Sequence, residues 1–164
     1  MSFSPRCRRI TIEDLDIVHD LAMQIWPKCY RRAIAPTQID ELASALFDLD
    51  RLEDAMDGGE SFWVVRVGEY DVGFISARLD GAYIRISRLY VLPDYRGFGL
   101  GKLLVQAAQG HFGPAQHLAV LVNKDHETSV DFCLRAGFAI DREIATQVGQ
   151  YGFTHYVMRK PLDA

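Results

Sequence analysis

The sequence predicts a mixed α/β fold. The first observation is a change of hydrophobic period, from helical in the N-terminal third to strand-like from Phe62 onward. The second is a Pro- and Gly-rich turn at residues 92–101, which joins an apolar strand to an amphipathic helix. The third is size, because 164 residues of 49% apolar composition can bury one core. We therefore expect a single domain over residues 1–164.

The N-terminal part is predicted to hold a short strand and two or three helices. Residues 8–12 alternate polar and apolar side chains, as a half-buried strand does. Asp14 can cap a helix with one apolar stripe, and Trp-Pro at residues 26–27 is expected to end or bend it. A second helical pattern covers residues 35–47, and residues 50–56 are expected to add a short helical turn.

Three antiparallel strands are predicted next, at residues 62–67, 72–79 and 83–92. The second and third are joined by Asp80-Gly81, a dipeptide typical of tight hairpin turns. Because short turns connect them, each strand is expected to pair with its neighbour in sequence, and the third leads directly into the glycine turn.

The C-terminal part alternates between helix and strand patterns. A helix over residues 100–108 has a clean apolar face, and residues 117–122 form a near-continuous apolar run typical of a strand buried on both faces. A further helix over residues 129–136 is expected to end at a glycine. Residues 138–146 and 151–159 are predicted to form a final antiparallel pair.

Composition and charge exclude several classes of function. A net charge of −4 gives no basic field for nucleic acid or an anionic membrane. Apolar runs fall far short of a membrane span, and residues 1–9 are not followed by the apolar segment of a signal peptide. Three widely spaced cysteines and five histidines form no ligand set, so we expect free thiols, no metal and a cytoplasmic location.

The glycine turn has the properties of a phosphate-binding loop. Glycines at alternate positions let the backbone approach a ligand closely, and the helix N-terminus behind them attracts anions. A P-loop is excluded because Arg96 and Leu103 stand where it needs glycine and serine or threonine. The dinucleotide fingerprint started at Gly97 fails too, since Lys102 replaces its last glycine and antiparallel strands precede the turn.

What remains is Arg96-x-x-Gly99-x-Gly101 after a strand that ends Val-x-Pro at residues 91–93. This pattern resembles the GNAT superfamily of acyl-CoA-dependent N-acyltransferases, in which Arg/Gln-x-x-Gly-x-Gly/Ala follows such a strand. Residues 132–138 resemble the family's Phe/Leu-Tyr-x-x-x-Gly-Phe, and the order of elements matches over about the whole chain. The resemblance implies a GNAT fold, with a mixed, mostly antiparallel central sheet flanked by helices.

The resemblance also implies a function. It is that of a small bacterial N-acetyltransferase, which transfers an acetyl group from acetyl-CoA to a primary amine of a small molecule or peptide by direct attack in a ternary complex. The backbone of the turn would hold the pyrophosphate, and the strand before it would hold the pantetheine arm and polarise the thioester carbonyl. The cofactor-binding positions implied are Leu89, Tyr90, Val91, Arg96, Gly97, Phe98, Gly99, Leu100, Gly101, Lys102 and His126.

The catalytic positions depart from the family pattern. Cys133 stands where the family often has a tyrosine general acid, and a thiol could also donate a proton. His126 stands where an asparagine often contacts coenzyme A, and it can still hydrogen-bond. The strands that sometimes carry a glutamate base have no carboxylate, which leaves Asp80 and His155 as candidate bases. Positioning alone, without a dedicated base, is the other option.

The acceptor site of this fold is shaped by the first two helices and the last strands. We expect Trp26, Tyr30 and Tyr151 to line it, with Glu41 or Glu60 attracting a cationic amine. Two further points stay open: a non-catalytic acyl-CoA-binding or sensor module is the alternative function, and a homodimer is an open assembly state.

Overall fold

The computed structural model describes residues 4–30, 34–148 and 151–162, and confirms the α/β fold class. One seven-stranded sheet has the order β1-β2-β3-β4-β5-β7-β6. The strands are β1 Pro5–Arg9, β2 Ser61–Val67, β3 Tyr70–Asp80, β4 Tyr83–Val91, β5 His117–Asn123, β6 Ala139–Val148 and β7 Tyr151–Pro161. The helices are α1 Leu15–Tyr30, α2 Pro36–Phe47, α3 Leu49–Asp57, α4 Leu100–Phe112 and α5 Glu127–Arg135.

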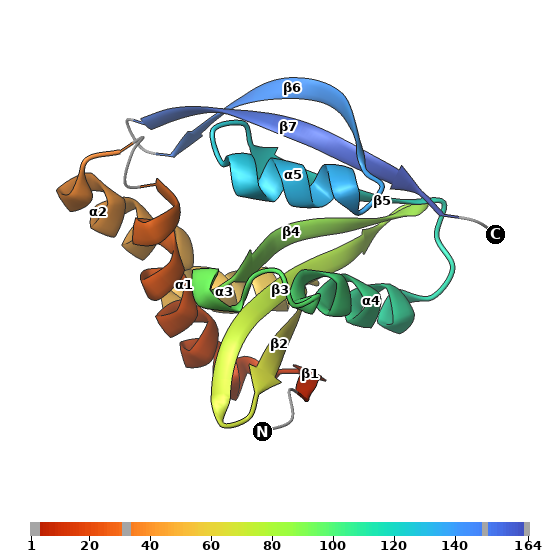
Figure 1. Ribbon diagram of the computed structural model, residues 1–164, viewed down its shortest axis with the longest axis horizontal. Coiled ribbons are helices and arrows are strands. Elements are labelled where there is room, and N and C mark those ends of the chain that lie inside the picture. The colour runs from red at the N-terminus through yellow and green to blue at the C-terminus, as the bar shows by residue number, and fades with distance from the viewer. Residues whose placement is uncertain (1–3, 31–33, 149–150, 163–164) are drawn as a thin grey trace.

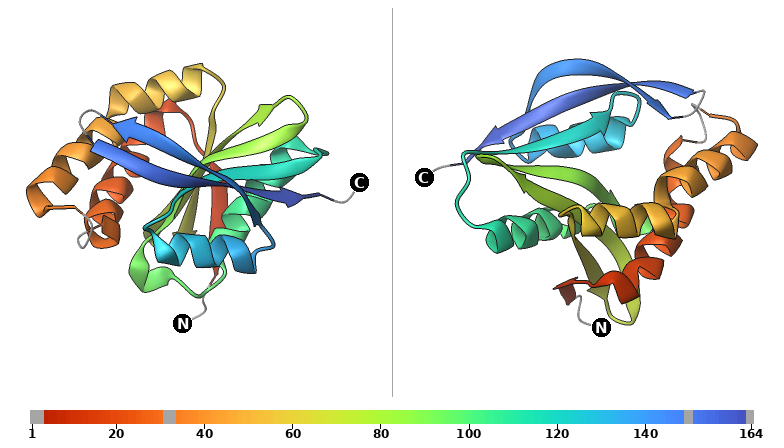
Figure 2. Two further views of the ribbon diagram at one scale, coloured as in Figure 1. Left: turned by 90° about the horizontal axis from the view of Figure 1, so that it is seen from above. Right: turned by 180° about the vertical axis from the view of Figure 1, so that it is seen from behind.

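The helices cover the two faces of the sheet in separate groups. Helices α1 to α3 pack on one face and α4 and α5 on the other, as the view from above shows (Figure 2). The alternation of side chains along β2 explains the division, since Phe62 and Val64 belong to the core under α1 to α3, whereas Trp63 and Val65 belong to the core under α4 and α5. The sheet is therefore buried on both faces through its middle.

The sheet opens between β4 and β5, which form its single parallel pair within the described chain. Their register runs only from Tyr83 opposite His117 to Ile86 opposite Val120. Beyond that point the two halves of the sheet diverge, with β3 and β4 on one side and β5 to β7 on the other (Figure 1). A register irregularity between β3 and β4 lies at the same level, where Ser76 pairs with Arg88 and Ala77 with Ile86. The extra residue, Ser87, forms a β-bulge, a feature that often re-aims side chains next to active sites.

The structure corrects the first predicted strand and shows that the first helix does not end at Trp-Pro. The first strand is β1 rather than residues 8–12, because its pairing with β2 ends at Arg9 and Ile10 enters the core instead. Helix α1 continues past Pro27 to Tyr30. Proline removes one hydrogen bond of the last turn, while Trp26 and Tyr30 stay buried with ring centroids 4.3 Å apart, so packing holds the turn in helical form.

Candidate active site

Three adjoining cavities follow the opening between β4 and β5. The largest, about 450 Å³, contains four arginines and is called here the arginine cavity. The turn cavity, about 420 Å³, lies at the glycine turn and α5. A junction cavity of about 60 Å³ lies between β4 and β5. It shares Tyr30 and Asn123 with the arginine cavity and His126 and Phe132 with the turn cavity. Tyr90 lines all three, so together they connect the two faces of the sheet.

The glycine turn presents backbone N–H groups to the turn cavity. Gly97 and Gly99 have φ of 84° and 80°, which explains the need for glycine there. Gly99 precedes α4, and the Leu103 N–H donates to its carbonyl at 3.1 Å. The N–H groups of the helix residues before Leu103 have no partner within α4. This arrangement favours an anion, since the helix dipole adds to the unpaired donors.

Most of the residues expected to bind the cofactor do line one cavity. Nine of them surround the turn cavity: Leu89, Tyr90, Val91, Arg96, Gly97, Gly99, Leu100, Gly101 and His126. Phe98 and Lys102 do not line it, and their side chains are exposed. Gly101 is needed for a different reason from Gly99, because a Cβ there would lie 2.9 Å from the Phe132 ring. It allows α4 to pack against α5.

His126 supplies a polar group between the turn and junction cavities. Its Nδ1 forms a hydrogen bond with the Ser129 hydroxyl, and its buried Nε2 has no partner among the described residues. Burial, with repulsion from the Arg96 guanidinium, lowers the pKa of His126 to about 4. The ring is therefore neutral at neutral pH, and Nε2 is a buried polar atom suited to a hydrogen bond with a polar ligand such as an amide.

The edge of β4 that faces the opening carries free backbone donors. The Leu92 N–H donates to the Val72 carbonyl at 2.8 Å, across to β3. Because successive N–H groups of a strand point to opposite edges, the Val91 N–H points toward the opening. A carbonyl oxygen in the opening could accept this bond, which is the arrangement of a small oxyanion site.

Cys133 lies at the junction cavity but is a weak acid there. Its side chain is buried, and burial raises the pKa of the Cys133 thiol to about 12. Tyr30 approaches the same cavity from α1, with its ring 5.5 Å from that of His126. Burial and nearby Tyr90 raise the pKa of Tyr30, so its hydroxyl stays protonated and can donate.

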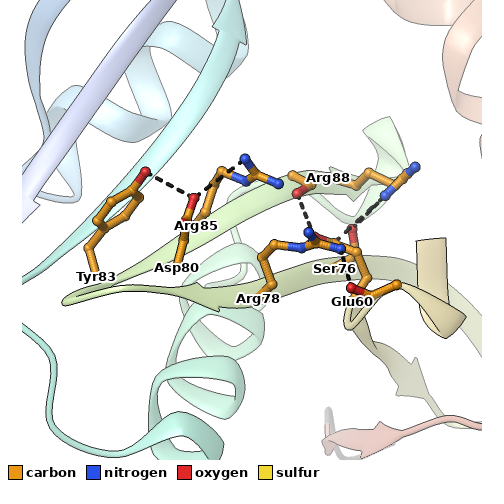
Figure 3. Close-up of polar contacts among 9 residues, drawn as sticks. Glu60, Ser76, Arg78, Asp80, Tyr83, Arg85 and Arg88 are labelled. Carbon is orange, nitrogen blue, oxygen red and sulfur yellow. Dashed lines mark hydrogen bonds and ion pairs between the residues drawn. The ribbon is translucent and has the colours of Figure 1, made fainter.

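The arginine cavity has one buried carboxylate surrounded by donors. Glu60 Oε1 accepts hydrogen bonds from Arg78 Nε and Ser87 Oγ, both at 2.9 Å. Glu60 Oε2 has no hydrogen-bond partner among the described residues and lies 3.8 Å from Arg88 Nη1 (Figure 3). The charge of Glu60 is thus matched by two arginines, contrary to the expectation that it attracts a cationic amine. Glu41 is exposed on α2 and lines none of the described cavities.

The other side of the arginine cavity is aromatic and neutral. Trp26 and Tyr30, two of the residues expected at the acceptor site, line it together with the candidate base His155. The third expected residue, Tyr151, lines a separate cavity of about 180 Å³ that also contacts Tyr30. His155 Nδ1 is 2.7 Å from the Thr146 hydroxyl, and burial lowers the pKa of His155. Its imidazole is therefore neutral at neutral pH and able to accept a proton.

Asp80 is not brought to any of these cavities. Its carboxylate accepts a hydrogen bond from the Tyr83 hydroxyl at 3.1 Å and lies 3.6 Å from Arg85 Nη1, at the end of the β3–β4 hairpin (Figure 3). We do not retain Asp80 as a base, because it is paired and lies outside the lining of the opening.

The sequence alone did not indicate that arginines would line the cavity at the opening. Arg78, Arg85 and Arg88 lie in the apolar strands β3 and β4, and Arg51 lies on α3. A signal was present, since charged residues inside otherwise apolar strands are unusual and often functional. Among the described residues, no group of three metal-ligating side chains is found, and no helix is long and apolar enough to cross a membrane.

Comparison with known proteins places the chain in a family. The acetyltransferase (GNAT) domain family matches residues 30–162. No curated protein sequence matches. Many solved structures are similar, among them two that match over nearly all of both chains. A GCN5-related N-acetyltransferase from Rhodopseudomonas palustris has 23% identity and a TM-score of 0.80, covering 99% of each chain. The PaiA N-acetyltransferase of Thermoplasma acidophilum, solved with coenzyme A, has 18% identity and a TM-score of 0.77, covering 97% of this chain and 99% of that one.

Proposed function

The chain belongs to the GNAT acetyltransferase family, and we propose that it transfers the acetyl group of acetyl-CoA to a primary amine. The observation that carries this proposal is the opening between β4 and β5, where the turn cavity and the arginine cavity meet. A two-substrate reaction needs such an arrangement, because each substrate must reach the reacting carbon from its own side. Holding both reactants in place removes several kcal/mol of the barrier.

The residues of the turn cavity fit acetyl-CoA in this proposal. The N–H groups at the start of α4 would bind the pyrophosphate, and glycine at 97 and 99 leaves open space above the backbone. The pantetheine arm would enter the opening, where His126 Nε2 is buried and unpaired among the described residues. The Thermoplasma PaiA structure, which holds coenzyme A, agrees with this use of the shared fold.

The reaction is direct attack on the thioester. The neutral amine nitrogen forms a bond to the carbonyl carbon, and negative charge develops on the carbonyl oxygen, next to the Val91 N–H. The carbon–sulfur bond then breaks, and coenzyme A leaves as a thiolate, which takes up a proton from solvent. A buried hydroxyl with a raised pKa, such as that of Tyr30, can donate a hydrogen bond to this sulfur.

His155 is the proposed base. It lies in the arginine cavity, and burial keeps it neutral at neutral pH. When Nδ1 donates to the Thr146 hydroxyl, Nε2 carries the lone pair that can accept the proton of the amine. As the amine nitrogen bonds to the carbonyl carbon it becomes acidic, and a base of this kind takes up the proton that it loses.

Binding and turnover measurements together test the proposal. Calorimetric titration of acetyl-CoA is expected to show saturable binding, and thiol release in the presence of a panel of amines is expected to exceed the rate without amine. Absence of binding at millimolar acetyl-CoA would reject the proposal. Binding without thiol release for any amine would instead favour a non-catalytic acyl-CoA-binding module.

A further inference from the structure

The arginine cavity has more positive charge than its acids can balance. Among the described residues, four arginines line it, at positions 51, 78, 85 and 88, together with one carboxylate, Glu60. Even when Asp80 is counted for its contact with Arg85 at 3.6 Å, two guanidinium groups remain in excess. The whole chain has a net charge of −4, so this local excess runs against the overall charge.

The β-bulge places three of these arginines on one face of the sheet. Arg85 and Arg88 are three residues apart, and in a regular strand they would point to opposite faces. Ser87 is the extra residue, so Arg85 pairs with Arg78 while Arg88 pairs with Ser76. Arg78 and Ser76 are two residues apart on β3 and share a face, which puts Arg78, Arg85 and Arg88 on the same side (Figure 3).

This arrangement brings like charges together, and a bound anion would relieve their repulsion. Arg78 and Arg85 stand directly opposite each other on antiparallel strands, and like charges in that position repel. Arg88 is also largely buried, with 17% of its side chain exposed and its guanidinium 5.6 Å from the centre of the Phe62 ring. Burial lowers the pKa of Arg88, and the Glu60 carboxylate opposes this effect.

Two of the arginines keep donors free for a ligand. Arg78 is held by Glu60 and by the Gly58 carbonyl, with both hydrogen bonds at 2.9 Å. Among the described residues, Arg88 has one hydrogen bond, to the Ser76 hydroxyl at 3.1 Å, besides its ion contact with Glu60, and Arg85 has the ion contact with Asp80 alone. A guanidinium has five N–H donors in a planar fork that matches carboxylate and phosphate oxygens.

We propose that the acceptor amine carries a carboxylate or phosphate group, which Arg85 and Arg88 bind in the arginine cavity. This inference rests on the proposed transfer reaction, because it defines the acceptor of that reaction. Strand residues advance about 3.3 Å each, so Arg88 lies about 7 Å along β4 from Tyr90, where the cavities meet, and Arg85 lies farther. The anionic group and the reacting amine therefore sit at separate ends of one molecule.

Matched pairs of amines test the inference. The pairs are lysine and lysinamide, triglycine and its C-terminal amide, and phosphoethanolamine and ethanolamine, each assayed with acetyl-CoA. At least one amine that carries the acid group (the anionic amine) is expected to exceed the partner in which that group is uncharged or absent (the neutral partner) about tenfold or more in kcat/KM, as charge-assisted hydrogen bonds allow. The first two pairs detect a carboxylate acceptor and the third a phosphate acceptor. Equal values within twofold in every pair would overturn the inference and leave the transfer reaction standing.

Variants locate the anion site. Arg85→Gln, at a side chain that is 45% exposed, is expected to raise KM for the anionic amine about tenfold, with little change for the neutral partner or for acetyl-CoA affinity. Arg66→Gln is the matched control, because Arg66 is 49% exposed, pairs with Asp71 at 3.8 Å and lines none of the three cavities. Arg88→Lys keeps the charge beside Glu60 and is expected to reduce, but not abolish, the preference for the anionic amine over its neutral partner. An unchanged preference in Arg85→Gln and Arg88→Lys would overturn the assignment.

A binding measurement separates the inference from the transfer reaction. The same amines are titrated calorimetrically into the protein in the presence of coenzyme A, which cannot react. Binding of an anionic amine that Arg85→Gln weakens, without any thiol release from acetyl-CoA, would support the anion site and reject the transfer. If no anionic amine binds more tightly than its neutral partner, the inference fails whatever the activity.

Discussion

The turn cavity and the arginine cavity meet at the same opening but are built in different ways. The turn cavity is formed largely by one continuous segment and its backbone N–H groups, with φ near 80° at Gly97 and Gly99. The arginine cavity is formed by side chains from elements spread between α1 and β7. Backbone donors do not depend on side-chain identity, so they suit a donor substrate common to many sequences of this fold. Side chains can differ from one sequence to another, so they can select one acceptor. The first cavity is thus suited to the common donor substrate and the second to specificity.

The largest effect is expected from a charge placed in the turn cavity. Gly99→Asp should weaken acetyl-CoA binding several hundredfold, because a carboxylate about 5 Å from a phosphate charge costs about 3 kcal/mol at an effective dielectric of 20. Titration calorimetry measures this change. The control is Gly99→Asn, which has the same shape and also tolerates positive φ. Equal losses in the two variants would show that shape rather than charge matters at the turn.

The second largest effect is expected on the acceptor side of the opening. His155→Gln should lower kcat about 100-fold, since a general base usually contributes at least that much, while acetyl-CoA affinity stays unchanged. Steady-state kinetics and calorimetry separate the two quantities. Because the pKa of His155 is lowered, the wild-type rate should not fall through this group until the pH is below about 6.5. If kcat in His155→Gln equals that of the wild type, His155 is not the base, and positioning of the two substrates alone accounts for the rate.

A control variant is available for this experiment. His111→Gln changes an exposed histidine of α4 that lines none of the described cavities, so kcat and its pH profile should stay as in the wild type. A comparable loss in both histidine variants would indicate a general effect on the fold.

A third effect concerns stability on the turn-cavity side. The pKa of His126 is about 4 in the folded protein and about 6.5 in the unfolded chain. As the pH falls below 6.5 the unfolded chain takes up the proton first, so the free energy of unfolding should fall, by about 2 kcal/mol between pH 6.5 and 4.5. Denaturant unfolding at several pH values measures this slope. His126→Asn should show a shallower slope, and an equal slope in both proteins would place the cause in other groups.

The smallest effect is expected at Cys133. Cys133→Ala should lower kcat less than about tenfold, because a thiol with a pKa near 12 is a poor proton donor at neutral pH. Cys133→Ser separates packing from chemistry, as it restores a donor of similar size. A loss of several hundredfold in the alanine variant, recovered by serine, would make Cys133 the general acid.

The difference between the two cavities also explains what could be predicted from the sequence. Residues 96–101 are contiguous, and their spacing follows from a local requirement of strand, turn and helix, so the turn could be identified without the fold. The order of strands and helices was predictable for the same reason, since hydrophobic periods and turn residues are local.

The arginine cavity could not be predicted in this way. Arg78, Arg85 and Arg88 share a face only because of the bulge at Ser87, and Glu60 reaches them only once β2 has paired with β3. The course of α1 past Pro27 depends likewise on the contacts of Trp26 with Tyr30 and Phe47. Each of these features results from tertiary contacts that override local sequence preference.

The proposed transfer depends most directly on where the thioester lies. A crystal structure of the protein with acetyl-CoA measures this position. We expect the pyrophosphate at the N-terminus of α4, the pantetheine arm between β4 and β5, and the thioester oxygen within hydrogen-bonding distance of the Val91 N–H, with the acetyl group facing Tyr30 and the arginine cavity. A pantetheine arm that lies outside the opening, or a thioester that faces away from the arginine cavity, would contradict the account.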